Sequence, residues 1–342
     1  MIVRILASLG ALVFAGFGVN SSVAQTELSM SAWVPPGHMI VRDILMPWAQ
    51  EVEKATQGRL RIKLLPKAVT NPIGHLDAVK DGLADIGFIA HSYTPQRFPM
   101  TRIGVLPFSG DNAEVNSVAL WRIYDRHFMK LNEHAGVQLL TIYTHGPGIV
   151  WTTKRVINKI EDFAGLKIRV GGGMAADVGQ ALGVNVIAKP APESYELLAS
   201  GVVDGVFFPG ESVASFKLEK LIKHATEFPG GLYSDSHAVI MNAERFAKLP
   251  RADQEAIMKL SGEPFARAAG QAWDKNARTG FDAMKANGGE THRADAAFVR
   301  SVKERTANFE QDFVKDVNAK GMDGAKILAE YRAELQKLGA AK

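Results

Sequence analysis

The chain has 342 residues and a nearly balanced charge, because 40 Lys and Arg residues against 36 Asp and Glu residues give a formal net charge of +4. The basic residues are spread along the sequence, which argues against nucleic-acid binding, while a mild positive balance suits small anionic ligands. The chain has no cysteine, so disulfides, thiolate zinc sites and cysteine nucleophiles are excluded.

Residues 1–24 have the features of a secretory signal peptide. Arg4 gives a positive start, an apolar run follows, and Ser22-Val23-Ala24 offers the small residues that a signal peptidase reads. The apolar run is too short and too rich in glycine for a membrane span. Cleavage before Gln25 would leave 318 of the 342 residues, with a formal charge of +3. We expect an exported, periplasmic protein that is large enough for two cores without disulfides.

After the signal peptide, apolar runs alternate with amphipathic segments, which is typical of an α/β protein. Strands are predicted at residues 28–34, 59–65, 86–90, 137–144, 166–170, 184–188, 206–208 and 237–242. Helices are predicted at residues 41–56, 75–82, 113–135, 174–182, 193–200 and 213–223. The pattern is near-continuously helical over 252–286, breaks at 287–289, and is helical again over 295–338.

One unit occurs twice in the sequence. Residues 77–90 align without a gap with residues 196–209, and both contain a helix end, a glycine, an aspartate and a strand. The aligned pairs include Gly82 with Gly201, Asp85 with Asp204, and Phe88 with Phe207. Two copies predict two similar lobes, with a cleft between them.

Arg169 is the first candidate for ligand binding. Period-2 alternation places Leu166, Ile168 and Val170 on one face of a strand, and Arg169 lies at its carboxyl end, where open α/β sheets bind ligands. A guanidinium can grip a carboxylate through two N–H donors, which a lysine cannot reproduce. The pattern alone leaves open, and slightly favours, a solvated arginine on a half-exposed strand.

A glycine run follows the same strand. Gly171, Gly173 and Ala176 match a loose G-x-G-x-x-A pattern, which would place a nucleotide phosphate at a helix N-terminus. Dinucleotides are scarce outside the cytoplasm, so we favour a tight turn that brings helix N–H groups near the anion of Arg169. A flexible joint without a function is the alternative.

The segment Gly210-Glu211-Ser212-Val213-Ala214 resembles a nucleophile elbow, with His224, His237 or His292 as a possible base. The final glycine of that motif is replaced by alanine, and no acid–histidine spacing accompanies it. We therefore expect Ser212 to be a helix N-cap. The nine histidines form no HExxH motif and no close ligand pairs, so we predict neither a metal site nor a cofactor.

Aromatic and histidine side chains gather at or just beyond the predicted strand ends. Each residue by itself has the character of a core or surface residue, whereas together they would line an aromatic-rich cleft. These residues are Trp33, His91, Tyr93, Trp151 and Tyr233.

Four segments resemble the extracytoplasmic solute receptors of tripartite ATP-independent periplasmic (TRAP) transporters. Residues 48–59 (WAQEVEKATQGR) are similar to the first helix and turn of that family. Residues 77–85, 163–170 and 193–204 are similar to its "sG–aD", "GLKIRV" and "E–Y–aL–sGvvDG" segments. The resemblance covers nearly the whole chain after the signal peptide.

The resemblance implies an α/β, two-lobed periplasmic-binding-protein-like fold that closes on its ligand, with a long helix spanning both lobes. Residues 251–286 fit that helix, and the carboxylate-binding arginine of the family falls on Arg169. The predicted division is 1–24 as signal peptide, 25–146 plus 234–273 as lobe I, 147–233 plus 274–330 as lobe II, and 331–342 as a C-terminal tail.

Two departures from the family pattern bear on the ligand. Ile149 stands where many members have a further arginine, and Phe208 stands where the family often has asparagine. Loss of two polar contacts disfavours a polar acid, so we predict a monocarboxylate with an apolar or aromatic body that packs on Phe207, Phe208, Ile149 and Trp151. A C4-dicarboxylate or a hydroxy or keto acid is the alternative. The further predicted ligand contacts are Trp33, His91, Ser92, Tyr93, Glu211 and Tyr233.

The predicted protein is a periplasmic receptor and not an enzyme. We expect it to be a monomer that delivers a small carboxylate to integral membrane transporter subunits. A secreted serine hydrolase using Ser212, and a receptor for an ATP-driven transporter or a sensor, are the alternatives.

Overall fold

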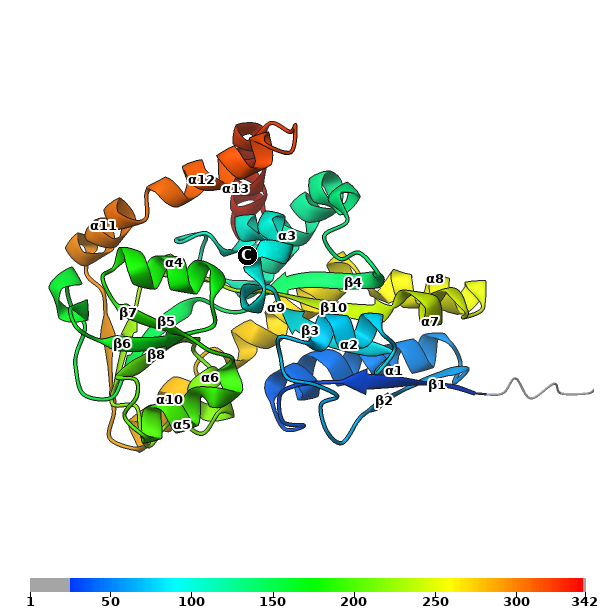
Figure 1. Ribbon diagram of the computed structural model, residues 1–342, viewed down its shortest axis with the longest axis horizontal. Coiled ribbons are helices and arrows are strands. Elements are labelled where there is room, and N and C mark those ends of the chain that lie inside the picture. The colour runs from blue at the N-terminus through cyan, green and yellow to red at the C-terminus, as the bar shows by residue number, and fades with distance from the viewer. Residues whose placement is uncertain (1–24, 341–342) are drawn as a thin grey trace, which may run out of the picture.

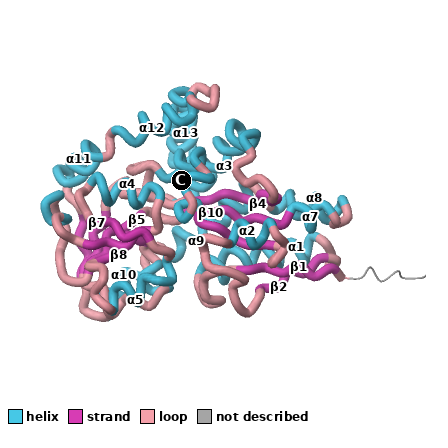
Figure 2. Tube along the Cα trace, in the orientation of Figure 1, coloured by secondary structure: helices cyan, strands magenta, loops and turns pink. Residues whose placement is uncertain are grey.

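A computed structural model describes residues 25–340, so the predicted signal peptide and the last two residues of the predicted tail lie outside the described residues. The chain forms two α/β lobes, each built around its own sheet (Figures 1 and 2). None of the described helices combines the length and apolar character needed to cross a lipid bilayer.

The sheet of the first lobe has the strand order β2-β1-β3-β10-β4. Its strands are β1 (Thr26–Ser31), β2 (Leu60–Leu64), β3 (Ile86–Ala90), β4 (Val137–Thr144) and β10 (Ser236–Asn242). The first three strands pair in parallel, and β10 enters antiparallel between β3 and β4. The chain therefore returns to the first lobe, after building much of the second, in order to complete this sheet.

The sheet of the second lobe has the order β11-β9-β5-β8-β6-β7. Its strands are β5 (Gly148–Thr152), β6 (Lys167–Val170), β7 (Asn185–Ala188), β8 (Gly205–Pro209), β9 (His224–Glu227) and β11 (Glu290–Arg293). Strand β5 is antiparallel to β8 and β9, and the other pairs are parallel. The sequence prediction missed β5, β9 and β11.

Helices cover both sheets. They are α1 (Met46–Ala55), α2 (His75–Lys80), α3 (Ala113–Ile123), α4 (Gly173–Ala181), α5 (Ser194–Ala199), α6 (Ser212–Ser215), α7 (Ala243–Ala247), α8 (Arg251–Leu260), α9 (Glu263–Asn276), α10 (Thr279–Ala286), α11 (Ala296–Arg305), α12 (Asn308–Asn318) and α13 (Gly324–Ala340). Helix α9 packs on α3 and β4 of the first lobe, and α10 packs on α6 and β11 of the second. The chain thus crosses between the lobes through α9 and α10 (Figure 1).

The repeated unit seen in the sequence has the same structure in both lobes. Gly82 and Gly201 adopt φ values of 78° and 71° after their helices, a conformation that favours glycine. The Asp85 carboxylate then accepts the Ser29 N–H at 2.7 Å, and the Asp204 carboxylate accepts that of Lys167 at 2.9 Å. Each aspartate thereby ties the start of its strand to the neighbouring parallel strand.

The long helix predicted over 252–286 is wrong in its continuity, because the structure divides it into α8, α9 and α10. Gly262 adopts φ 65°, its N–H donates to the Leu140 carbonyl at 2.6 Å, and its own carbonyl accepts the Thr141 hydroxyl at 2.9 Å. The backbone at this break therefore bonds to β4 instead of continuing the helix.

Two further predicted helices are too long. The helix predicted over 213–223 is only the four residues of α6, since Lys217 turns to φ 58° and the chain then leads into β9. The helix predicted over 113–135 ends as regular α-helix at Ile123, continues as π and 3₁₀ turns, and stops where Asn132 adopts φ 54°.

Each lobe has a buried core, and the C-terminal helices pack on both lobes. Phe298 of α11 contacts Phe163 and Phe228 of the second lobe, and α13 packs on α3 of the first. In Figure 1, α11, α12 and α13 run from the second lobe across to the first. The tail boundary predicted at 331 falls inside α13, where Tyr331 is buried. The domain boundaries remain a prediction.

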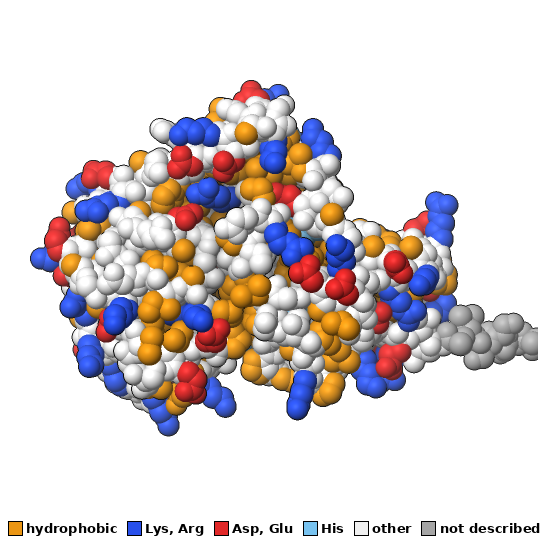
Figure 3. Space-filling view, viewed as in Figure 1, with side chains coloured by type: hydrophobic (Ala, Val, Ile, Leu, Met, Phe, Trp, Pro, Cys, Tyr) orange, Lys and Arg blue, Asp and Glu red, His pale blue; other side chains and the backbone are white. Residues whose placement is uncertain are grey.

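The visible surface has no block of a single charge. Lys and Arg side chains are interspersed with Asp and Glu over the face shown in Figure 3, and hydrophobic side chains appear in patches between them. This surface agrees with the dispersed charges of the sequence.

Candidate functional site

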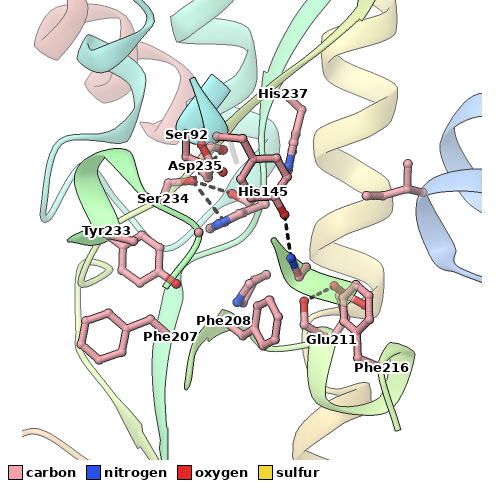
Figure 4. A pocket seen from close by; sticks show the side chains of 18 of the residues that line it. Ser92, His145, Phe207, Phe208, Glu211, Phe216, Tyr233, Ser234, Asp235 and His237 are labelled. Atoms are coloured by element: carbon pink, nitrogen blue, oxygen red, sulfur yellow. Dashed lines mark hydrogen bonds between the residues drawn. The ribbon is translucent and has the colours of Figure 1, made fainter. Parts of the chain in front are cut away.

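A cavity of about 60 Å³ lies between the lobes, which is room for a few waters or one compact ligand. Both lobes contribute to its wall (Figure 4). Its lining includes Trp33, His38, Ser92, Tyr93, His145, Arg169, Gly171, Gly172, Met174, Phe207, Phe208, Glu211, Ser212, Phe216, Tyr233, Ser234, Asp235, His237 and Trp273.

Arg169 lies on the interior strand β6 and is buried, with 2% of its surface exposed. Its Nε and Nη2 groups donate to the Lys189 carbonyl at 2.9 and 2.6 Å, which fixes the side chain. The guanidinium carbon lies 4.4 Å from the centre of the Phe208 ring, a cation–π contact. Burial lowers the pKa of Arg169, but an arginine remains charged in a protein.

This buried cation has no ion-pair partner within 4.0 Å among residues 25–340. An unpaired charge in a low-dielectric interior is costly, and an anion in the cavity would relieve that cost. The arrangement therefore suits a ligand carboxylate.

Asp235 is the acid of the cavity wall whose charge interacts with that of Arg169. Its carboxylate accepts the Ser92 hydroxyl and, at 2.8 Å, the Ser236 N–H. Burial raises the pKa of Asp235 to about 7, against these hydrogen bonds and the charge of Arg169. Glu211 lies elsewhere on the wall, and burial also raises its pKa to about 7. Both acids therefore change between the neutral and the ionised form near pH 7.

Aromatic rings form much of the wall. Phe207 stacks on Tyr233 with ring centres 5.8 Å apart, and Phe208 stacks on Phe216 at 5.5 Å (Figure 4). Trp33 reaches from the first lobe and packs partly against the core of the second. Flat apolar walls of this kind suit a planar hydrophobic body.

Three buried histidines add polar atoms to the same cavity. Burial lowers the pKa of His38 and of His145 to about 4 each, and lowers that of His237 well below its usual value. The imidazoles are therefore neutral at pH 7. His38 Nε2 and His237 Nδ1 are buried and have no hydrogen-bond partner in the described part of the chain.

The two lobes touch beside the cavity. The Tyr93 hydroxyl of the first lobe accepts the Ala191 N–H of the second at 3.0 Å. The glycine run packs on Ser92, and a Cβ added to Gly172 would lie 2.4 Å from the Ser92 carbonyl oxygen. The glycines thus allow the lobes to approach closely. A second cavity, of about 600 Å³, shares Ser92, Tyr93 and Gly172 with the first.

The structure gathers eight of the predicted ligand contacts around the cavity. These are Trp33, Ser92, Tyr93, Arg169, Phe207, Phe208, Glu211 and Tyr233. The strand ends of β3, β6 and β8 and the loop before β10 carry most of them.

Three predicted contacts lie outside the cavity wall. Trp151 is buried against Phe281 at 4.6 Å and donates its N–H to the Phe208 carbonyl at 3.0 Å. Ile149 lies on the same face of β5, within the core of the second lobe. His91 is bonded to Ser236 and His134 and faces the second cavity. Both Trp151 and Ile149 share the sheet face of Phe208, but they lie deeper in the core than Phe208, which reaches the cavity.

The N-cap predicted at Ser212 is wrong. Glu211 occupies that position without a side-chain cap, and the Ser212 hydroxyl donates to the Glu211 carboxylate at 2.6 Å. The hydroxyl therefore points to a neighbouring acid. Among the described residues, no histidine bonds this hydroxyl, so the nucleophile–base contact of a serine hydrolase is not formed.

Sequence reasoning missed Asp235, His145, His237, Phe216 and Trp273 as parts of this wall. Asp235 directly precedes β10, and ligand sites are expected at the carboxyl ends of strands. Because β10 is antiparallel, His237 lies opposite Ala90 at the carboxyl end of β3. The antiparallel strand β10 therefore brings its amino-terminal end to the cavity, beside the carboxyl end of β3.

The model of the bacterial extracellular solute-binding proteins, family 7, matches residues 30–316. The chain belongs to this family. It is a solute receptor of the TRAP type and not an enzyme, as the sequence predicted. Family members act in the periplasm together with membrane transporter subunits, and the predicted location and partner class are confirmed at that level.

Solved structures resemble the chain over nearly its whole length. A TRAP periplasmic solute-binding protein from Bordetella bronchiseptica with bound (R)- and (S)-mandelate is 55% identical, covering 92% of this chain and 99% of that chain with a TM-score of 0.89. A TRAP solute-binding protein from Rhodoferax ferrireducens T118 in complex with copurified benzoate is 27% identical, covering 93% and 99% with a TM-score of 0.87. The "Outer membrane transporter protein TsaT" of Comamonas testosteroni is 30% identical over 95% of this chain and 96% of its own length.

Proposed function

We propose that this receptor binds an aromatic monocarboxylate with a further hydroxyl or carbonyl group and delivers it to its membrane transporter. The observation that carries the proposal is Arg169, a buried cation without an ion-pair partner among residues 25–340, beside stacked aromatic rings. The guanidinium would hold the carboxylate in a charge-assisted bond. The rings of Phe207, Phe208 and Phe216 would enclose the aromatic body.

Unbonded polar atoms of the lining residues are the reason for proposing a hydroxyl or carbonyl group on the ligand. His38 Nε2 and His237 Nδ1 are buried without a partner in the described residues, and an unbonded buried polar atom is costly. A hydroxyl or carbonyl of the ligand would satisfy at least one of them. The similar proteins solved with mandelate and with benzoate agree with an aryl acid.

The cavity wall disfavours a dicarboxylate. Among the described residues that line the cavity, Arg169 is the single Lys or Arg side chain. The lining histidines His38, His145 and His237 are neutral at pH 7. A second carboxylate would lie near Asp235 or Glu211 without a cation of its own. We also propose that the receptor acts as a monomer and does not bind nucleic acid, in keeping with its dispersed surface charge.

Calorimetry with the mature protein tests the proposal. We expect mandelate to bind, and phenylacetate and benzoate to bind less tightly, while succinate gives no heat at the same concentrations. Arg169→Ala and Arg169→Lys should each lose about 1.5–3 kcal/mol of binding free energy, because neither restores the forked charge-assisted bond. Unchanged mandelate affinity in Arg169→Ala would contradict the assigned role. Saturable binding of succinate in preference to aryl acids would overturn the ligand class.

A further inference from the structure

Two histidines and a glutamate meet at the edge of the sheet in the second lobe, away from the cavity. His224 begins β9, and Glu290 and His292 lie two residues apart on the edge strand β11. Strands β9 and β11 pair in parallel, with Glu290 opposite His224 and His292 opposite Thr226. Residues two apart share a face of a strand, so the ladder itself brings the three side chains to one face.

The distances are those of a metal site. His224 Nδ1 and His292 Nε2 share a hydrogen bond at 3.3 Å, and one ligand atom from each of the three side chains falls within 4.8 Å of the others. Two nitrogens bound tetrahedrally to one zinc ion at about 2.0–2.1 Å are separated by about 3.3–3.4 Å. The two imidazoles are therefore already spaced as ligands of a single ion.

The carboxylate needs only a small movement to join them. Glu290 Oε2 lies 4.0 Å from His292 Nε2, and 73% of the Glu290 side chain is exposed, so it is free to turn inward. The His224 side chain also has a hydrogen bond to the backbone of Lys154. Ligating histidines commonly use such an outer bond to fix the tautomer and the orientation of the ring.

We propose that His224, Glu290 and His292 form a binding site for a divalent transition metal ion, with Zn²⁺ as the preferred probe. Two imidazoles and one carboxylate suit zinc, and they suit the hard ions Mg²⁺ and Ca²⁺ poorly. Three protein ligands leave a fourth position for water.

The bound ion would join β11 to β9. Strand β11 is the outermost strand of its sheet and follows α10, through which the chain enters the second lobe from the first. None of the three side chains lines the ligand cavity. The ion should therefore stabilise the fold without changing recognition of the carboxylate, and this separates the metal site from the proposed ligand site.

The test uses the mature chain without a histidine tag, freed of metal by a chelator and titrated with ZnCl₂. We expect one Zn²⁺ per chain by calorimetry, a higher unfolding temperature with zinc than without, and no effect of MgCl₂. His292→Ala and Glu290→Gln should weaken zinc binding at least about tenfold, by analogy with the loss of supporting groups at metal sites. Both variants should bind mandelate as the unaltered protein does, which verifies their folding.

His127→Ala is the matched control, because His127 also bonds a glutamate, Glu330, at 2.7 Å. Among the described residues, this pair is not part of a group of three metal-ligating side chains. That variant should bind zinc like the unaltered chain. Absence of zinc binding at 100-fold molar excess would overturn the proposal, and so would equal zinc affinity in His292→Ala. If mandelate fails to bind any form while zinc still binds, the proposed function fails and the metal site stands.

Discussion

At the scale of single residues, the site combines a permanent cation with acids that titrate. Arg169 is held by the Lys189 carbonyl and by the Phe208 ring, so its position does not depend on a ligand. Asp235 accepts bonds from Ser92 and Ser236 and has a pKa raised by burial to about 7. The charge that an anionic ligand meets therefore changes near neutral pH, and this change can be measured.

Asp235 predicts how ligand affinity depends on pH. An aryl carboxylate is anionic throughout pH 6–8, whereas Asp235 loses its proton as the pH rises through about 7. The ionised acid repels the ligand and competes for Arg169, so affinity should fall as the pH rises, by up to about tenfold per unit above the pKa. Calorimetry at pH 6, 7 and 8 measures the slope. Asp235→Asn should flatten it, and an unaltered slope in that variant would contradict this account.

At the scale of elements, the turn between β6 and α4 closes the site. Gly172 adopts φ 119° and Gly173 φ 50°, conformations that residues with a side chain rarely take. Their lack of a Cβ lets this turn rest against the backbone of Ser92 in the other lobe. The sequence pattern that resembled a nucleotide loop is thus explained by close approach of two backbones.

Gly172→Ala tests the importance of this contact. Its Cβ would lie 2.4 Å from the Ser92 carbonyl oxygen, so the lobes would have to separate, and affinity for mandelate should fall about tenfold or more through strain of about 1–3 kcal/mol. Gly183→Ala is the matched control, since Gly183 has φ 81° but nothing within 4 Å of an added Cβ. Both variants should be somewhat less stable to heat. Equal affinity in the two variants would show that the contact does not govern closure.

At the scale of the whole molecule, burial of titratable groups sets how stability depends on pH. Six histidines are buried, with pKa values lowered chiefly by desolvation: His38, His75, His91, His134, His145 and His237. Three carboxyls have pKa values raised by burial to about 7: Glu133, Glu211 and Asp235. The two groups act in opposite directions on the free energy of unfolding.

The histidines should dominate below pH 6.5. Below pH 6.5 the histidines bind protons in the unfolded chain but stay unprotonated in the folded chain. The folded state therefore loses stability as the pH falls. Raised carboxyl pKa values instead favour the folded state as the pH falls from 7 to about 4, but fewer groups contribute. We expect the unfolding temperature to decrease from pH 7 to pH 5, as measured by circular dichroism. An unfolding temperature that rises over this interval would contradict the neutral burial of these histidines.

The sequence by itself determined much of this molecule through local patterns. The glycine–aspartate repeat depends on short-range geometry, in which a left-handed glycine ends a helix and an aspartate accepts a neighbouring N–H. Alternation along β6 made Arg169 a candidate, although the pattern alone slightly favoured a solvated side chain, and the structure shows that Arg169 is buried. The family resemblance followed from such segments, because the same turn requires the same residue types in each protein that contains it.

Only the tertiary structure decided which side chains share a space. Trp151 and Ile149 pack in the core of the second lobe and do not line the cavity, whereas Asp235 and His237 reach it because β10 runs antiparallel to β3. His224 and His292 are 68 residues apart and meet only because β9 and β11 pair in register. Sheet order and strand direction are set by packing between distant segments, and no local pattern of residues encodes them.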